Sequence, residues 1–234
     1  MGFYYRFRKI FKFPIPLIFK KYLKEFYGKN QLDKKLLKYL NYNNGFYIEI
    51  GAYDGITQSN TFYLERKKNW KGILIEPSKK VFDKCIKYRS NKNYFYNRAC
   101  VSFNYKNKYL KLNYSGLKTY SDKFLEKKRI KDYISNPEIL YGDRTYTYNV
   151  LAVTMNSLLS KSNAPKIIDF MSLDTEGAEF EILKGINFKK YKFRYLLIES
   201  NSFVKLKKFM KKNEYDFIKK FNENDFLFKF STIK

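Results

Sequence analysis

Apolar residues come in short runs along this chain, and the runs end at small or acidic residues. Phe46–Ile50 is a β-prone run that leads into a turn with two glycines, and Gly72–Ile75 is a second run that ends at Glu76. A third run lies near Tyr94, and stretches with the helical spacing of apolar residues separate the three. This order predicts β-α-β-α-β, the first half of a doubly wound sheet.

The same alternation returns in the C-terminal half of the chain. Ile168–Leu173 predicts a buried strand that ends in the turn Asp174–Gly177, and Tyr195–Ile198 predicts the next strand. The last two runs, Tyr215–Ile218 and Phe226–Phe230, predict an antiparallel pair that closes the sheet. The pattern as a whole is typical of the α/β class.

Two parts of the chain depart from this pattern, and we predict a domain of residues 31–234 behind an arm of residues 1–30. The arm mixes aromatic with basic residues, so it either contacts an anionic membrane surface or packs on the domain. Residues 102–150 predict an irregular insertion, with a polar helix near Ser121–Tyr133 and a loop over 141–148. Such insertions often determine acceptor specificity, although a surface excursion without a role is the alternative.

The composition is strongly basic, with 48 Lys and Arg against 22 Asp and Glu and a formal net charge of +26. A charge of this size favours nucleic acid or an anionic membrane as partner. However, the basic residues are mostly Lys, and Asn, Ile, Phe and Tyr are abundant as well. These residue types share A/T-rich codons, so genome composition explains much of the charge. We therefore do not expect nucleic acid as the partner.

Histidine is absent, which excludes a histidine base, nucleophile or metal ligand. The two cysteines, Cys85 and Cys100, stand apart, as is usual for a reducing compartment. No run approaches the roughly 18 apolar residues of a membrane span, and no secretory signal pattern is present. We therefore expect a cytoplasmic protein, with peripheral membrane contact through residues 1–30 as the alternative.

Acidic residues follow three of the predicted strands, at the sheet edge where open α/β folds bind ligands. The first turn has the spacing E-x-G-x-x-D-G, with acids at Glu49 and Asp54, where a dinucleotide site would have G-x-G-x-x-G. A carboxylate repels pyrophosphate but accepts hydrogen bonds from an ammonium group or a ribose, which favours S-adenosylmethionine over NAD. Glu76 is placed to accept from both ribose hydroxyls. For any single acid, a helix cap or a solvated loop is the alternative.

These segments together resemble the FkbM family of S-adenosylmethionine-dependent methyltransferases. The matching segments are EIGAYDGITQSNTFYLE at 49–65, WKGILIEP at 70–77, the Ser115-Gly116 turn, IDFMSLDTEGAEFEILKG at 168–185, LLIES at 196–200 and NDFLF at 224–228. The resemblance implies the class I, Rossmann-like fold: a mostly parallel seven-stranded sheet with a C-terminal antiparallel strand and helices on both faces. It also implies O-methylation, often of a sugar or polyketide hydroxyl. One departure is Glu49, where the family commonly has Asp.

Residues around the first two acidic strand ends are expected to bind S-adenosylmethionine. They are Glu49, Gly51, Ala52, Asp54, Gly55, Asn60, Glu76, Pro77 and Ala99. Asp174 and Glu176 follow a later strand, beside the expected methyl position, and are the candidate catalytic residues. A divalent metal, Mg²⁺ or Mn²⁺, held by Asp174, Glu199 and Asn201 is an alternative way to activate the acceptor hydroxyl.

We therefore expect an S-adenosylmethionine-dependent O-methyltransferase that acts on a hydroxyl of a sugar, a glycan or another small hydroxylated acceptor. One alternative is a methyltransferase directed at RNA or protein, which only the basic charge supports. Another is a non-catalytic module of the same fold that binds polyanions or membranes. The aligned acids at the strand ends argue against this last alternative, because a decayed site has no reason to keep them.

Overall fold

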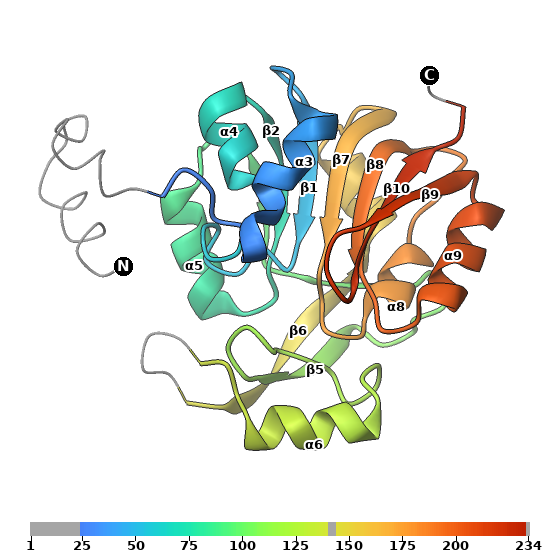
Figure 1. The fold of residues 1–234 in the computed structure, drawn as a ribbon. Coiled ribbons are helices and arrows are strands. Elements are labelled where there is room, and N and C mark those ends of the chain that lie inside the picture. Colours follow the sequence, from blue (N-terminus) through green and yellow to red (C-terminus); the bar gives the residue numbers. More distant parts are fainter. Residues whose placement is uncertain (1–23, 140–143, 233–234) are drawn as a thin grey trace, which may run out of the picture.

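The computed structural model describes residues 24–139 and 144–232, and its central element is a seven-stranded sheet (Figure 1). The strands of this sheet are β1 (Phe46–Ile50), β2 (Lys71–Ile75), β3 (Tyr94–Tyr96), β7 (Ile167–Leu173), β8 (Lys192–Glu199), β9 (Tyr215–Lys220) and β10 (Asp225–Phe230). Their order in the sheet is β3-β2-β1-β7-β8-β10-β9. Pairing is parallel from β3 through to β8, whereas β10 is antiparallel to both of its neighbours. This topology confirms the predicted class I fold.

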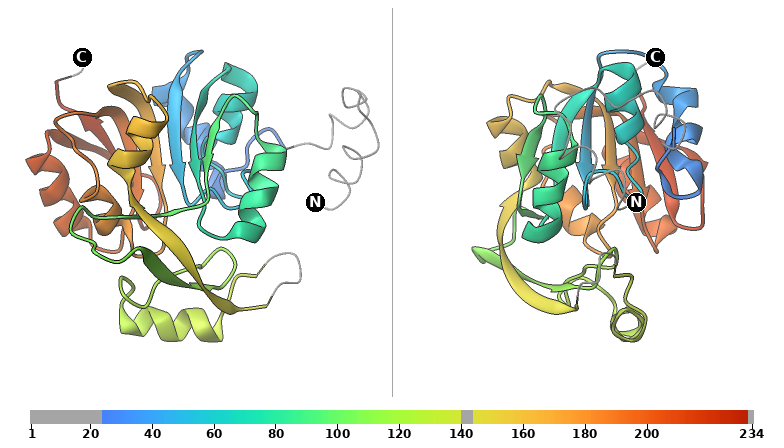
Figure 2. Two further views of the ribbon diagram at one scale, coloured as in Figure 1. Left: turned by 180° about the vertical axis from the view of Figure 1, so that it is seen from behind. Right: turned by 90° about the vertical axis from the view of Figure 1, so that its left-hand side faces the viewer.

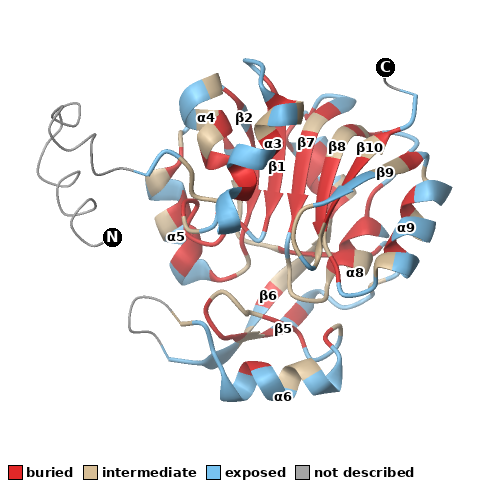
Figure 3. Cartoon of the chain, viewed as in Figure 1, coloured by how far each residue is buried: buried red, intermediate tan, exposed pale blue. Residues whose placement is uncertain are grey.

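Helices cover both faces of the sheet (Figure 2). They are α3 (Leu32–Leu40), α4 (Phe62–Lys68) and α5 (Lys79–Tyr88) on one face, and α7 (Met155–Lys161), α8 (Glu179–Leu183) and α9 (Phe203–Lys212) on the other. Alternation along β1 explains the two layers: Tyr47 packs with Leu36 of α3 and Leu64 of α4, whereas Ile48 belongs to the core that includes Leu159 and Leu206. Figure 3 shows the central strands buried along their length. No helix of the described residues is long and apolar enough to cross a bilayer.

The segment between β3 and α7 forms a second, smaller unit. It contains β4 (Ala99–Val101), β5 (Tyr109–Tyr114), α6 (Lys127–Ser135) and β6 (Tyr146–Thr154), and its three strands form a sheet in the order β4-β6-β5. In Figures 1 and 2 this unit lies across the carboxyl ends of the parallel strands. The insertion is more regular than the sequence predicts, because Tyr146 and Tyr148 pair with β5 and are not part of a loop. The predicted helix near Ser121–Tyr133 begins later, at Lys127, because Ser121 directs a local turn instead.

One buried cation joins three of the elements around the first turn. Arg89 directly follows α5, and its guanidinium is completely buried. It donates from Nη1 to Glu49 Oε2 (3.1 Å) and the carbonyl oxygen of Gly55 (2.9 Å), and from Nε to Glu65 Oε2 (2.8 Å). Burial alone would raise the pKa of Glu65, but its ion pair and hydrogen bond with Arg89 outweigh burial and lower that pKa. Arg89 thus fixes β1, the turn and α4 to one another.

Replacing this cation tests its role in stability. Arg89→Met leaves the carboxylates of Glu49 and Glu65 buried without their positive partner, so we expect a loss of about 3–5 kcal/mol in the free energy of unfolding. Urea denaturation followed by circular dichroism measures it. Arg66→Met is the matched control, because Arg66 is exposed and, among the described residues, its guanidinium lies over the rings of Tyr27 and Phe62 without an ion pair. A loss no larger than that of the control would contradict the assigned role.

Candidate functional site

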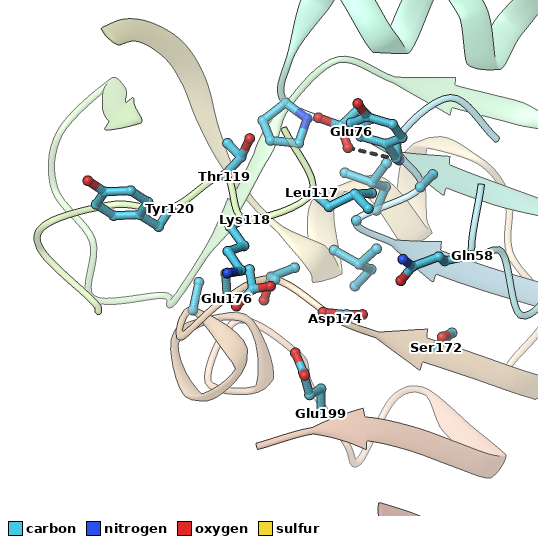
Figure 4. Close-up of a pocket in the computed structure, with 18 of the residues that line it drawn as sticks. Gln58, Glu76, Leu117, Lys118, Thr119, Tyr120, Ser172, Asp174, Glu176 and Glu199 are labelled. Carbon is cyan, nitrogen blue, oxygen red and sulfur yellow. Dashed lines mark hydrogen bonds between the residues drawn. The ribbon is translucent and has the colours of Figure 1, made fainter. Parts of the chain in front are cut away.

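A cavity of about 420 Å³ lies where the parallel strands end. Its floor is formed by residues that follow β1, β2, β7 and β8, and residues from the insertion line its other side. Figure 4 shows Glu76, Asp174 and Glu199 entering it from the sheet, with Lys118 and Thr119 facing them from the insertion. This volume is in the range of small-molecule sites, and the position is where open α/β sheets bind ligands.

The turn after β1 forms the part of the floor next to β7. Gly51 has φ +85°, and a Cβ there would lie 2.0 Å from the carbonyl oxygen of Asp174. Glycine is therefore required, both by the backbone conformation and by the close approach of the β7 turn. Gly51 and Ala52 donate their N–H groups to the carbonyl oxygen of Ile75, which fixes the turn against β2. Both residues line the cavity, as predicted.

Asp54 and Gly55 differ from the prediction, since neither lines the cavity. Asp54 is buried, and its Oδ1 accepts from the N–H groups of Ile56 and Thr57. A Cβ on Gly55 would lie 2.7 Å from Cγ of Arg89, so this glycine allows the guanidinium to pass behind the turn. The two residues shape the turn from its far side, and their predicted contact with the cofactor stays a prediction.

Glu49 lines the cavity, but its carboxylate is occupied by the protein. Its oxygens accept from the hydroxyls of Ser59 and Thr61, from the N–H of Asn60 and from Arg89. These bonds give Glu49 a positioning role, because the acid holds residues 59–61 in place; its predicted cofactor contact stays a prediction. Because the glutamate reaches Arg89 and residues 59–61 together, this network accommodates the departure from Asp.

Asn60 and Glu76 present hydrogen-bonding groups to the cavity. Asn60 is 9% exposed; its Nδ2 donates to Ser172 Oγ (3.1 Å), while its Oδ1 has no hydrogen-bond partner among the described residues. Glu76 accepts from the N–H of Tyr53 (2.9 Å) and of Ser78 (2.7 Å), and burial raises its pKa to about 7. Two of roughly four acceptor positions on that carboxylate remain for a ligand. Pro77 and Ala99 line the cavity as well.

Three carboxyl groups meet below the insertion: oxygens of Asp174, Glu176 and Glu199 all lie within 4.8 Å of one another. The negative charge of Asp174, with burial and a hydrogen bond between the two groups, raises the pKa of Glu199. At neutral pH Glu199 therefore keeps its proton, and its O–H donates a hydrogen bond to Asp174. Figure 4 shows both side chains pointing into the cavity.

Glu176 is held by the insertion. Its Oε2 accepts from the hydroxyl of Tyr133 and from Arg129 Nη2 (3.0 Å), two side chains of α6. Burial, followed by the charge of Asp174, raises the pKa of Glu176, and the contacts from α6 oppose that shift. Glu176 thus joins the insertion to the β7 turn, whereas Asp174 stays more open to the cavity. Sequence reasoning missed Arg129 and Tyr133; their helical i, i+4 spacing was the only available signal.

The predicted metal ligands are only partly brought together. Asp174 and Glu199 are adjacent, but the third nearby carboxylate is Glu176. Asn201 lines the same cavity, and its Oδ1 accepts from Asn224 Nδ2 (3.2 Å). The oxygen groups suit Mg²⁺ or Mn²⁺. Arg129 already pairs with Glu176 (3.0 Å), and a metal at this site stays a prediction.

Comparison with known proteins decides the family. The family model described as "Methyltransferase FkbM domain" matches residues 49–227. The chain belongs to this family. That finding confirms the resemblance seen in the sequence, and it places the chain among S-adenosylmethionine-dependent methyltransferases of class I fold. A search of curated proteins gave no match.

Solved structures resemble the chain at low sequence identity. M. capricolum TrmK, in complex with S-adenosyl-homocysteine, is 14% identical with a TM-score of 0.39; the match covers 86% of this chain and 65% of TrmK, less than two thirds of it. Precorrin-6y C5,15-methyltransferase from Geobacter metallireducens GS-15 is 11% identical (TM-score 0.40; 88% and 90% covered). A human methyltransferase 10 domain containing protein is 12% identical (TM-score 0.42; 87% and 83% covered).

The raised pKa of Glu76 makes ligand binding depend on pH. A ribose donates hydrogen bonds, so it selects the ionised carboxylate, which is the minor form below pH 7. We expect the affinity for S-adenosylhomocysteine to fall about tenfold from pH 8 to pH 6. The reason is that the ionised fraction of Glu76 falls by about that factor when the pH drops to one unit below the pKa of this carboxyl group. Isothermal titration measures it. Glu76→Gln should bind more weakly at pH 8 and lose this pH dependence; an unchanged profile in that variant would assign the effect to another group.

Proposed function

We propose that this protein is an O-methyltransferase that transfers the methyl group of S-adenosylmethionine to a hydroxyl of a sugar, a glycan or another small hydroxylated acceptor. The observation that carries the proposal is the carboxyl pair Asp174 and Glu199, which faces the cavity beneath the insertion. An ionised carboxylate at the edge of a donor cavity is the group that a hydroxyl acceptor needs as its base in a chain without histidine.

The residues present fit the donor. Glu76 would accept from the ribose hydroxyls, and the orphaned Oδ1 of Asn60 would accept from the ammonium group. Pro77 and Ala99 offer small apolar surfaces for the adenine, beside the strand end that carries Glu76. Gly51 and Ala52 line the cavity beside these groups. When bound, S-adenosylmethionine supplies an electrophilic methyl group on a sulfonium.

Asp174 would accept the proton of the acceptor hydroxyl as the oxygen–methyl bond forms and the sulfur–methyl bond breaks. Glu199 would keep its own proton throughout, and its hydrogen bond orients the Asp174 carboxylate. Glu176, bound by Tyr133 and Arg129, would hold the insertion over the site and exclude water. Of the two predicted catalytic residues, Asp174 therefore keeps the role of base, and Glu176 becomes a positioning residue.

The wall of the cavity contributed by the insertion supports a carbohydrate-like acceptor. Tyr120, Tyr133, Lys118 and Thr119 line this wall; the two tyrosine rings are buried and pack edge to face (5.6 Å between centroids), and Lys118 pairs with Glu138 (3.3 Å). A wall that mixes apolar with polar side chains suits a sugar, whose ring has apolar faces and a hydroxyl rim. This supports the expectation that residues 102–150 select the acceptor.

The wider predictions remain proposals. The basic charge still offers RNA or a protein as an alternative acceptor, and a non-catalytic module that binds polyanions or membranes is the further alternative. Cytoplasmic location is proposed from the sequence. The predicted peripheral membrane contact concerns residues 1–30, of which 1–23 lie outside the described residues.

Removing the charge of Asp174 tests the mechanism. We expect Asp174→Asn to lower turnover by roughly 10²–10⁴-fold, the usual contribution of a general base, while S-adenosylhomocysteine affinity stays within about twofold because the donor contacts are elsewhere. The assay is transfer of a labelled methyl group to a panel of nucleotide sugars and glycans. Asp83→Asn, at an exposed surface ion pair, is the control. Full turnover in Asp174→Asn would exclude Asp174 as the base.

Chelation separates the metal-free route from the metal route. Because Asp174 and Glu199 share a hydrogen bond, we expect dialysis against EDTA to leave turnover unchanged, and added Mg²⁺ or Mn²⁺ to change it by less than about twofold. The same labelled-methyl assay measures this. Loss of turnover on chelation and its recovery with either metal would establish the metal route instead.

A further inference from the structure

Residues that precede the family domain take part in the cavity. The family match begins at residue 49, yet Lys29 and Leu32 are among the residues that line the cavity. They belong to the segment Phe26–Leu32, called here the strap, which leads into α3 and contains the short 3₁₀ helix Lys29–Gln31 (Figure 1, dark blue). The fold of the sheet does not require this segment at the donor site, so its position there needs an explanation.

Aromatic contacts anchor the strap on α4, the helix that follows the cofactor turn. Phe26 stacks on Tyr63 with 4.7 Å between ring centroids, and Tyr27 meets Phe62 edge to face at 5.2 Å. At the other end, Leu32 is buried in the core. The strap is therefore fixed on both sides of the residues that reach the cavity.

Backbone contacts fix its middle. Gly28 forms a parallel β-bridge with Gln58, and the N–H of Tyr27 donates to Asp33 Oδ2 (2.6 Å). A Cβ on Gly28 would lie 3.0 Å from Asn60 Oδ1, which places the strap directly against the orphaned oxygen of the cofactor turn. Gln31 follows with φ +57°, a left-handed conformation that persists only where the surroundings impose it.

Lys29 is distinct among the cations of the cavity. Four cationic side chains line it in the described part of the chain: Lys29, Arg98, Lys118 and Arg129. Lys118 pairs with Glu138 and Asp132, and Arg129 pairs with Glu176. Neither Lys29 nor Arg98 has an ion pair within 4.0 Å in the residues described, and Arg98 follows β3, beside Ala99. Lys29 is thus a cation without a close ion pair on the side of Gln58 and Asn60, although its charge reaches Asp225 and opposes the rise that burial causes in the pKa of that carboxyl group.

The groups on this side complement a free amino acid. Lys29 offers a positive charge, while Asn60 Oδ1 offers an unused acceptor and Asp225, also in the lining, a carboxylate. An α-amino acid presents one carboxylate and one ammonium group, which need one cation and one or more acceptors. Figure 4 shows Gln58 on this side of the cavity, away from Lys118 of the insertion.

We propose that the strap completes the donor site and that Lys29 binds the carboxylate of the donor's amino-acid end, while Asn60 Oδ1 accepts from its ammonium group. This inference rests on the proposed use of S-adenosylmethionine. It makes donor affinity depend on a segment outside the family domain. It also makes Lys29 a specificity residue, because it distinguishes nucleosides with the amino-acid end from those without it.

Two ligands isolate the contribution of the amino-acid end: S-adenosylhomocysteine, which has it, and 5′-methylthioadenosine, which shares the adenine, ribose and thioether but lacks it. Isothermal titration of the full chain gives both affinities. We expect Lys29→Met to lower the affinity for S-adenosylhomocysteine about tenfold, as loss of one charge-assisted contact does. The affinity for 5′-methylthioadenosine should stay unchanged. Lys29→Arg should restore most of the loss, and Lys38→Met, at an exposed lysine of α3, should match wild type for both ligands.

Each outcome bears on the proposal. Wild-type affinity for S-adenosylhomocysteine in Lys29→Met would overturn it, and so would an equal loss for both ligands, which would show general disruption of the cavity. Equal affinities of the wild-type protein for 5′-methylthioadenosine and S-adenosylhomocysteine would also overturn it, while leaving the nucleoside site intact. A folded wild-type protein that binds neither ligand would refute the proposed function itself.

Discussion

The architecture of the site depends on one buried guanidinium. Arg89 reaches under the first turn, where its completely buried guanidinium forms ion pairs with both Glu49 and Glu65. Two carboxylates and a turn carbonyl could not be packed together at this depth without that positive charge. Because Arg89 holds the turn from behind, the front of the turn is free to present Gly51, Ala52 and Asn60 to a ligand.

The sheet then brings distant acids to the same edge. Parallel pairing of β1 with β2 and β7 sets their carboxyl ends side by side, so Glu76 and Asp174 flank the glycine turn although 98 positions separate them in the numbering. The adjacent strand β8 adds Glu199, whose proton stays in place because Asp174 is charged. The insertion covers these acids through Glu176, and the strap covers the opposite side through Gly28 and Gln58. The floor of the cavity, its insertion side and its strap side thus come from three different parts of the chain.

The sequence predicted the parts that follow from local patterns. Periodicity and spacing in the sequence indicate the strands of the sheet, the closing antiparallel pair and the acidic strand ends. The observed topology confirms the fold. Contacts across the chain could not be predicted in this way. Asp54 was taken for a ligand group because its spacing fits a loop motif, whereas its carboxylate caps the turn itself. Arg89 and Arg129 belong to no recognisable sequence motif. Their carboxylate partners Glu65 and Glu176 lie 24 and 47 positions away. Lys29 was assigned to the arm because its neighbours are basic.

The central claim is that the cavity holds the methyl donor with its reactive end toward Asp174. A crystal structure of the complex with S-adenosylhomocysteine tests this most directly. The account predicts ribose hydroxyls within hydrogen-bonding distance of Glu76 and the sulfur facing Asp174 and the insertion, which is the geometry that an in-line transfer requires. A ligand bound outside this cavity, or one whose sulfur points away from Asp174, would contradict the account.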